Sequence, residues 1–348
     1  MTGFPRARTA VVGASTFGLG ECPGWSSMEM TAQAAYLALD DAGITLDQVD
    51  GLFTALPDDF LGGLALAEYL GIQPKITDNN RTGGSSFLCH AIHAALALDA
   101  GMIDVALITY GSNQRTASGG LVSALRSSVY ETPHRPMMPV GGYALAANRH
   151  MHDFGTTRED LAHVALAARA WANKNPEAFR QGDMTLDDVL SARLISTPLT
   201  ARDCCLVTDG AAAVVMTRAD RAASTRAPIP LLGGAQTVTH KEIAAMPDLT
   251  VTGAAISGPQ AMQAAGITPD DVDCVQLYDA FTINTILFLE DLGFCPKGEG
   301  GRFVSSGAIA VGRRHLNLPA GPLKLDENQA AAATGIAAQS ERTILQLF

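Results

Sequence analysis

Two short stretches combine residue types that could do chemistry. In Thr82-Gly83-Gly84-Ser85-Ser86, two glycines permit positive φ and a close approach of a ligand to the backbone, and small hydroxyls can cap a following helix. Free N–H groups at such a helix start favour a developing negative charge. In Tyr278-Asp279, a phenol and a carboxylate follow an apolar strand, where open α/β folds place reacting groups. The alternative is structural: Asp279 caps a helix and Tyr278 packs.

The first stretch lies within a segment that predicts a strand, the glycine turn, a helix and a second strand, over residues 76–113. The helix predicted over Phe87 to Ala100 is apolar almost all round, which predicts burial at the centre of the fold. A turn fixed on a buried helix is rigid, as a reaction site requires. The second strand ends in Gly111-Ser112-Asn113.

A repeat sets the larger organisation. The sequence AGITLDQVD at residues 42–50 recurs as AGITPDDVD at 265–273, each time after an alanine-rich helix and before an apolar strand. Such a repeat predicts a duplicated α/β domain. We expect an N-terminal half at residues 1–113, an inserted loop or cap segment at 114–203, and a C-terminal half at 204–348.

Composition excludes several functions. A formal charge of −11 weighs against nucleic acid as a ligand, whereas a coenzyme A thioester stays open if a local cluster of Arg or Lys meets its phosphates. Six cysteines without CxxC spacing predict reduced thiols and no zinc site. The Gly-rich loop after the first strand does not complete GxGxxG, so a dinucleotide site is not favoured. No apolar run approaches the ~18 residues of a membrane span, and no signal peptide is evident, which predicts a cytoplasmic protein.

Several blocks together resemble the thiolase superfamily, specifically sterol-carrier-protein-x-type thiolases and thiolase-like lipid-transfer proteins. They are the glycine turn with its buried helix and GSN, TARDCCLVTDGAAAVVMT at 200–217, YDAFT at 278–282 and LEDLGFCPKGEGGRF at 289–303. The resemblance implies a thiolase fold, in which two βαβαβ-type halves form α-β-α-β-α layers. It also implies acyl-CoA thioester substrates, with coenzyme A as part of the substrate and no other cofactor. The strand before Asn79 would pair with its two-fold mate in a homodimer.

The catalytic positions of the family are altered in this chain. Its nucleophilic cysteine matches Gly83, its Asn or His position matches Tyr278, and its Gly-His-Pro histidine matches Gln329. The sequence ends at Phe348, before the hairpin that carries the family's last cysteine. Thiolysis needs a thiolate that becomes acylated, so we expect no conventional thiolase activity. Cys89 lies further along the buried helix, where packing is its expected role.

One branch of the family, the retro-aldolases of steroid side-chain degradation, implies a different activity. There a tyrosine replaces cysteine chemistry in cleaving a β-hydroxyacyl-CoA, and a small OB-fold protein is the partner. By resemblance, Tyr278 and Asp279 are the catalytic candidates, and Gly83, Gly84, Ser85 and Asn113 are the substrate-binding candidates. Tyr278 would then take the β-hydroxyl proton, which requires a lowered pKa or a relay through a neighbour. A related acyl transfer that uses Tyr278 is also open. The alternative is a non-catalytic thiolase-fold subunit that binds acyl-CoA or lipid or scaffolds a complex.

The C-terminal region, from Ala310 on, departs from the family pattern. A second tyrosine expected near the final glycine loop is missing, and His315 is the candidate acid–base substitute there. A solvated basic loop is the alternative for the Arg313-Arg314-His315 run.

Overall fold

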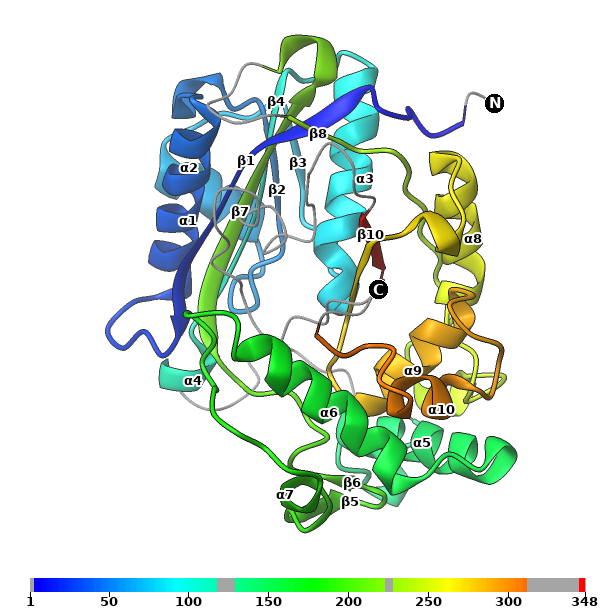
Figure 1. Ribbon diagram of the computed structural model, residues 1–348. Coiled ribbons are helices and arrows are strands. Elements are labelled where there is room, and N and C mark those ends of the chain that lie inside the picture. Colours follow the sequence, from blue (N-terminus) through cyan, green and yellow to red (C-terminus); the bar gives the residue numbers. More distant parts are fainter. Residues whose placement is uncertain (1–2, 118–128, 223–227, 312–343, 348) are drawn as a thin grey trace.

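The computed structural model describes residues 3–117, 129–222, 228–311 and 344–347. Its helices and strands alternate along most of the chain (Figure 1). The strands are β1 (Thr9–Gly20), β2 (Gly51–Thr54), β3 (Ile76–Asp78), β4 (Val105–Ser112), β5 (Leu194–Ser196), β6 (Leu199–Thr200), β7 (Asp209–Arg218), β8 (Ile229–Pro230), β9 (Cys274–Leu277) and β10 (Ile344–Leu347). The helices are α1 (Ser27–Ala42), α2 (Gly62–Leu70), α3 (Ser86–Asp99), α4 (Gln114–Ala117), α5 (Val140–Phe154), α6 (Arg158–Ala172), α7 (Leu186–Leu190), α8 (Ala254–Ala265), α9 (Thr282–Asp291) and α10 (Gly300–Ser305).

The described elements form the predicted α-β-α-β-α layers. A six-stranded sheet has the order β3-β2-β4-β7-β1-β8, with β2 parallel to β3 and β4, and with β7 antiparallel to β4 and β1. Helices α1 and α2 cover one face of this sheet, and α3 lies on the other face, between the sheet and the parallel pair β9–β10 (Figure 1). Helix α8 covers the far side of that pair. The predicted burial of α3 at the centre is therefore confirmed.

The sheet also shows where the predicted division of the chain needs correction. Strand β7 lies within residues 204–348, which we assigned to the C-terminal half. It pairs instead with β4 and β1 in the sheet of the N-terminal half. The continuous run of small and apolar residues in Asp209–Arg218 fits a buried central strand in either half, so the local pattern could not decide between them.

The repeat is visible in three dimensions. Both copies end a helix at a left-handed glycine, Gly43 and Gly266, and continue through a short 3-10 turn into a buried strand. The packing is duplicated as well, because a Cβ added to Gly13 would meet the Ala42 nitrogen at 2.8 Å, and one added to Gly233 would meet the Ala265 nitrogen at 2.7 Å. The chain at Gly13, within β1, and at Gly233, just after β8, thus touches the backbone of a helix at the same place in each half, which supports the predicted duplication.

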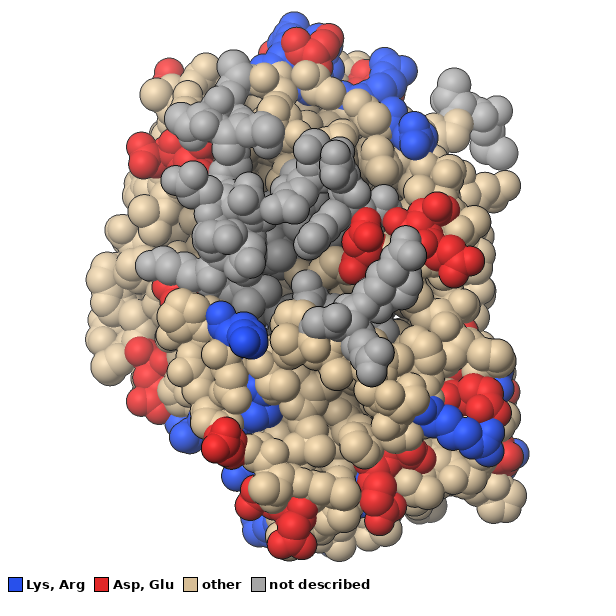
Figure 2. Space-filling model, in the orientation of Figure 1, with Lys and Arg blue, Asp and Glu red and all other residues tan. Residues whose placement is uncertain are grey.

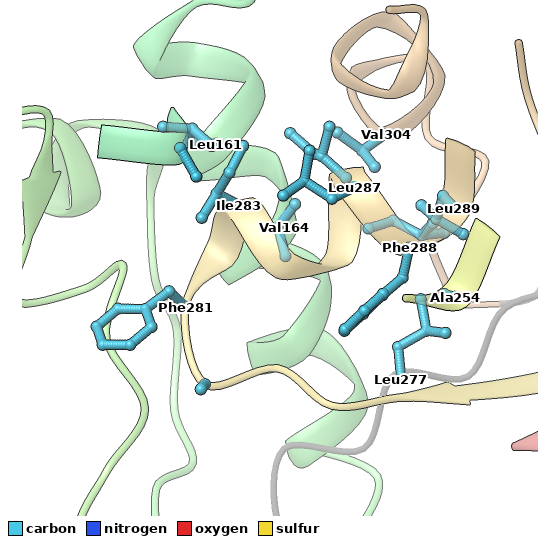
Figure 3. Packing of buried hydrophobic residues seen from close by; sticks show 14 of the residues in the cluster. Leu161, Val164, Ala254, Leu277, Phe281, Ile283, Leu287, Phe288, Leu289 and Val304 are labelled. Atoms are coloured by element: carbon cyan, nitrogen blue, oxygen red, sulfur yellow. The ribbon is translucent and has the colours of Figure 1, made fainter. Parts of the chain in front are cut away.

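Helices α5 and α6 of the inserted segment pack against α9. Leu161 and Val164 of α6 lie in a buried cluster with α9, and Val304 of α10 joins the same cluster (Figure 3). Helix α5 is held to α9 by a fully buried hydrogen bond, in which His150 Nε2 lies 3.0 Å from Glu290 Oε1. Because α9 follows directly from β9, these contacts fix the end of that strand.

Charged side chains do not form a broad basic surface on the face shown in Figure 2. Among the described residues of that face, Lys and Arg are interspersed with Asp and Glu, mostly near its edge. None of the helices in the described part of the chain has the length and apolar character needed to cross a membrane.

The duplicated contact gives a stability test. Replacing Gly13 or Gly233 with Ala forces a methyl group against helix backbone, and we expect each change to lower the free energy of unfolding by about 2 kcal/mol. Gly3→Ala is the matched control, because a Cβ at Gly3 meets nothing within 4 Å. Urea denaturation measures all three variants. A loss at Gly13 with none at Gly233 would contradict the duplicated packing.

Candidate active site

The structure brings the two predicted stretches together from opposite halves. Tyr278 follows β9, and its ring lies directly on Gly84, because a Cβ added to that glycine would be 2.8 Å from Tyr278 Cζ. The glycine is therefore required so that the phenol can approach the turn. Tyr278 retains 39% of its exposure, so its side chain is only partly covered.

The turn itself adopts the predicted backbone but not the predicted cap. Gly83 has φ of +80°, and residues 83–85 form a 3-10 turn that leads into α3. The hydroxyls do not cap the helix as we predicted, because Ser85 Oγ donates to the Thr82 carbonyl and Ser86 Oγ donates to the Gly83 carbonyl. The Thr82 N–H donates to Ser86 Oγ in turn. These bonds tighten the turn against the buried helix.

Three residues that sequence reasoning missed interact electrostatically with Tyr278. Electrostatic interactions that raise the Tyr278 pKa come from Tyr143 on α5, Cys205 after β6, and Tyr110 on β4. Tyr143 packs against Phe281 with ring centroids 4.3 Å apart. These residues come from elements far apart in the sequence, and no local motif marks them. Only the position of Cys205 within the family-like block at residues 200–217 could have drawn attention to one of them.

A buried carboxylate positions the loop that carries Cys205. Asp203 Oδ2 accepts hydrogen bonds from the Thr200 N–H at 2.7 Å and from Arg158 Nη1 at 2.9 Å, while Oδ1 accepts from Thr282 Oγ1 at 2.9 Å. The Cys205 N–H then donates to the carbonyl of Ala280 at 2.9 Å. The loop is thereby attached to the first residues of α9, next to Tyr278.

Burial separates the protonation states of the two predicted catalytic residues. Desolvation raises the pKa of Asp279 to about 6, opposed by a hydrogen bond from its own backbone N–H. Desolvation is the largest cause that raises the pKa of Tyr278 to about 12. Electrostatic interactions with neighbouring groups raise it as well, in the order Tyr143, Cys205, Asp279 and Tyr110. The expectation that the Tyr278 pKa must be lowered is corrected, because burial and neighbouring acidic groups both oppose a phenolate. At neutral pH the site holds a neutral phenol beside a carboxylate able to accept a proton.

The remaining candidates lie elsewhere or have other contacts. Asn113 donates from Nδ2 to the Trp25 carbonyl at 3.0 Å, and none of its described contacts is with Tyr278 or the turn, so its substrate-binding role stays a prediction. Cys89 is buried, with Sγ 3.6 Å from Thr82 Oγ1. Gln329 and His315 lie outside the described residues.

Two histidines on α3 have separate environments. His90 is fully buried among aromatic rings, whereas His93 Nδ1 lies 2.6 Å from Asp78 Oδ2. Within the part of the chain that the structure describes, no group of three or more His, Cys, Asp or Glu side chains is placed to hold a metal ion.

The fold and the strand-end site define a thiolase-like α/β protein, and comparisons identify the family. Residues 235–322 match the family model "Thiolase C-terminal domain-like". The chain is 33% identical over 330 residues to the 17-hydroxy-3-oxo-4-pregnene-20-carboxyl-CoA lyase of Mycobacterium tuberculosis, covering 88% of this chain and 84% of the relative. It is 30% identical to the acetyl-CoA acetyltransferase of Methanothermobacter thermautotrophicus, covering 95% of this chain and 89% of the relative.

Among solved structures, the chain is similar to the "Ltp2-ChsH2(DUF35) aldolase", with a TM-score of 0.82 and 28% identity over 90% of this chain and 84% of that chain. The chain therefore belongs to the thiolase superfamily, in the branch that includes sterol-carrier-protein-type thiolases and thiolase-like aldolases. The resemblance inferred from the sequence blocks is confirmed.

The contact between Gly84 and Tyr278 predicts a selective loss of function. In Gly84→Ala, the added methyl group occupies the place of the Tyr278 ring, so the phenol must rotate away while the flexible side chain spares the fold. We expect turnover to fall by about 100-fold, as for a misplaced catalytic group. Steady-state kinetics on a β-hydroxyacyl-CoA thioester measure the loss of turnover, and thermal unfolding measures whether the fold is spared. Unchanged turnover would show that this position of Tyr278 is not the working one.

The raised pKa of Asp279 predicts a gain in stability upon its neutralisation. Since the folded-state pKa of about 6 exceeds the ordinary value of 3.8, folding favours the protonated form, and stability falls as pH rises through that window. Asp279→Asn removes the buried charge. We expect the variant to have a higher melting temperature than the wild type at pH 8 and an advantage that vanishes near pH 4. An advantage that is equal at both pH values would contradict the assigned pKa.

Proposed function

We propose that the protein cleaves a carbon–carbon bond of a β-hydroxyacyl-CoA by a retro-aldol reaction. The observation that carries the proposal is the pairing at the end of β9: a neutral phenol, Tyr278, lies on a turn that has glycine at the nucleophile position, beside the proton-accepting Asp279. A retro-aldol reaction needs a base for a hydroxyl and stabilisation of an enolate, but no acylated nucleophile. Each of these requirements has a counterpart in the site.

The steps assign a role to each group. The β-hydroxyl gives its proton to Asp279 through the Tyr278 hydroxyl, and its oxygen becomes a carbonyl. The electrons of the Cα–Cβ bond move to Cα and form the enolate of the shortened thioester. The N–H groups of the turn near Gly84 and Ser85 stabilise the enolate oxygen, and Gly83 leaves room for the thioester. An acid then protonates Cα, which completes a ketone or aldehyde and a shortened acyl-CoA.

Two relatives support the assignment in their names. The lyase of Mycobacterium tuberculosis acts on a carboxyl-CoA of a hydroxylated steroid, and the similar solved structure is called an aldolase. The acetyltransferase relative has comparable identity, so names alone do not decide, and the proposal rests on the chemistry of the site. We infer a bulky hydrophobic acyl group, such as a polycyclic one, as the substrate.

We also propose a two-component assembly in the cytoplasm. The aldolase structure carries the name of a second component, which supports a small OB-fold partner for this chain. The short strand β3 pairs only with β2 among the described strands, so its outer edge is available to a second copy in a homodimer. Six free cysteines fit a reducing compartment.

The direct test is product analysis by mass spectrometry. The wild type, alone and with an OB-fold protein encoded beside it, is incubated with a panel of β-hydroxyacyl-CoA thioesters. We expect a ketone or aldehyde plus a shortened acyl-CoA, and a loss of at least 100-fold in Tyr278→Phe with thioester binding retained. Tyr69→Phe, an exposed change on α2, is the matched control. Binding of thioesters without any product under either condition would favour the non-catalytic subunit.

A further inference from the structure

Tyr143 on α5 is held in the site by contacts that orient its hydroxyl. Its ring packs on Phe281 at 4.3 Å between centroids and 31° between planes. Phe281 is three residues beyond Tyr278 and precedes α9, so Tyr143 packs on the short segment that also carries Tyr278. The buried hydrogen bond between His150 and Glu290 joins α5 to α9.

The hydroxyl of Tyr143 has a dedicated partner. Asn284, one turn into α9 and 6% exposed, forms a side-chain hydrogen bond with Tyr143. When the amide donates to the phenol oxygen, the phenol hydrogen is free to be donated elsewhere. Asn284 Oδ1 is buried and has no hydrogen-bond partner within the described residues. A buried amide with an unused acceptor is costly in an ordinary core, which indicates that this position serves the site.

The two phenols interact electrostatically, as expected for side chains that belong to or pack on the segment between β9 and α9. Among neighbouring groups, Tyr143 contributes most to raising the Tyr278 pKa, and Cys205 raises the pKa of both tyrosines. Burial is the largest cause that raises the Tyr143 pKa, and the hydrogen bond with Asn284 lowers it. Both phenols are therefore neutral proton donors at physiological pH. Tyr278 and Asp279 have roles in the steps above, whereas Tyr143 has none.

We propose that Tyr143 is a further catalytic residue, the acid that protonates the α-carbon of the enolate. This inference rests on the proposed retro-aldol reaction. The O–H bond of Tyr143 breaks as a C–H bond forms at Cα, where the enolate supplies the electron pair, and the phenolate receives the proton that Asp279 took from the β-hydroxyl. Protons and electrons balance without water or another reactant. Asn284 stabilises the transient phenolate by donating its amide hydrogen bond.

Proton exchange isolates this step from bond cleavage. The short thioesters acetyl-CoA and propionyl-CoA are incubated with the protein in deuterium oxide, and α-deuterium is measured by mass spectrometry. We expect exchange by the wild type and a loss of at least 100-fold in Tyr143→Phe, in both exchange and cleavage. Phenylalanine keeps the ring contact with Phe281, and 3-fluorotyrosine at position 143, which keeps the hydroxyl, restores exchange. Tyr69→Phe is the control, and thermal unfolding confirms that each variant folds.

The outcomes separate the two proposals. Tyr143-dependent exchange without cleavage of any β-hydroxyacyl-CoA would overturn the retro-aldol function and keep Tyr143 as the acid–base group at the α-carbon. Cleavage and exchange at wild-type rates in Tyr143→Phe would overturn the role of Tyr143 and leave the retro-aldol function in place. Absence of exchange in the wild type would also overturn the role of Tyr143.

Discussion

The buried carboxylate of Asp203 is the interaction on which the site depends. It is 1% exposed and joins three separate parts of the chain, through Thr200, Arg158 and Thr282. Burial of a charge without such partners costs several kcal/mol, so the hydrogen bonds must form together and hold the loop and the two helices in one arrangement. That arrangement places the end of β9 and its tyrosine against the turn of the other half.

The chemistry of the site follows from burial more than from any single motif. The same desolvation raises the pKa of Asp279 towards neutrality and moves that of Tyr278 far above it, which separates a proton acceptor from proton donors. A glycine at the nucleophile position of a thiolase fold leaves space where a covalent intermediate would otherwise form. The fold thus supports cleavage through proton transfer in place of acyl transfer.

Much of the fold could be predicted from the sequence, because its signals are local. The repeated AGIT segment, the helix that begins near Phe87 and the strand before Tyr278 all lie within a few residues of their predicted positions. The membership of β7 was missed, since strand pairing is a long-range property. Tyr278 and Asp279 were found from strand-end position and resemblance. Tyr143 was missed because only the packing of α5 on α9 brings it to the site.

The central claim is that burial makes Asp279 the proton acceptor beside a neutral Tyr278. Carbon-13 NMR of selectively labelled aspartate measures this directly, with the Asp279 carboxyl signal assigned by its absence in Asp279→Asn. The account predicts a carboxyl that titrates near pH 6, well above the ordinary value of 3.8. A carboxyl that titrates at or below pH 4 would contradict it, because the site would then hold only a weak base.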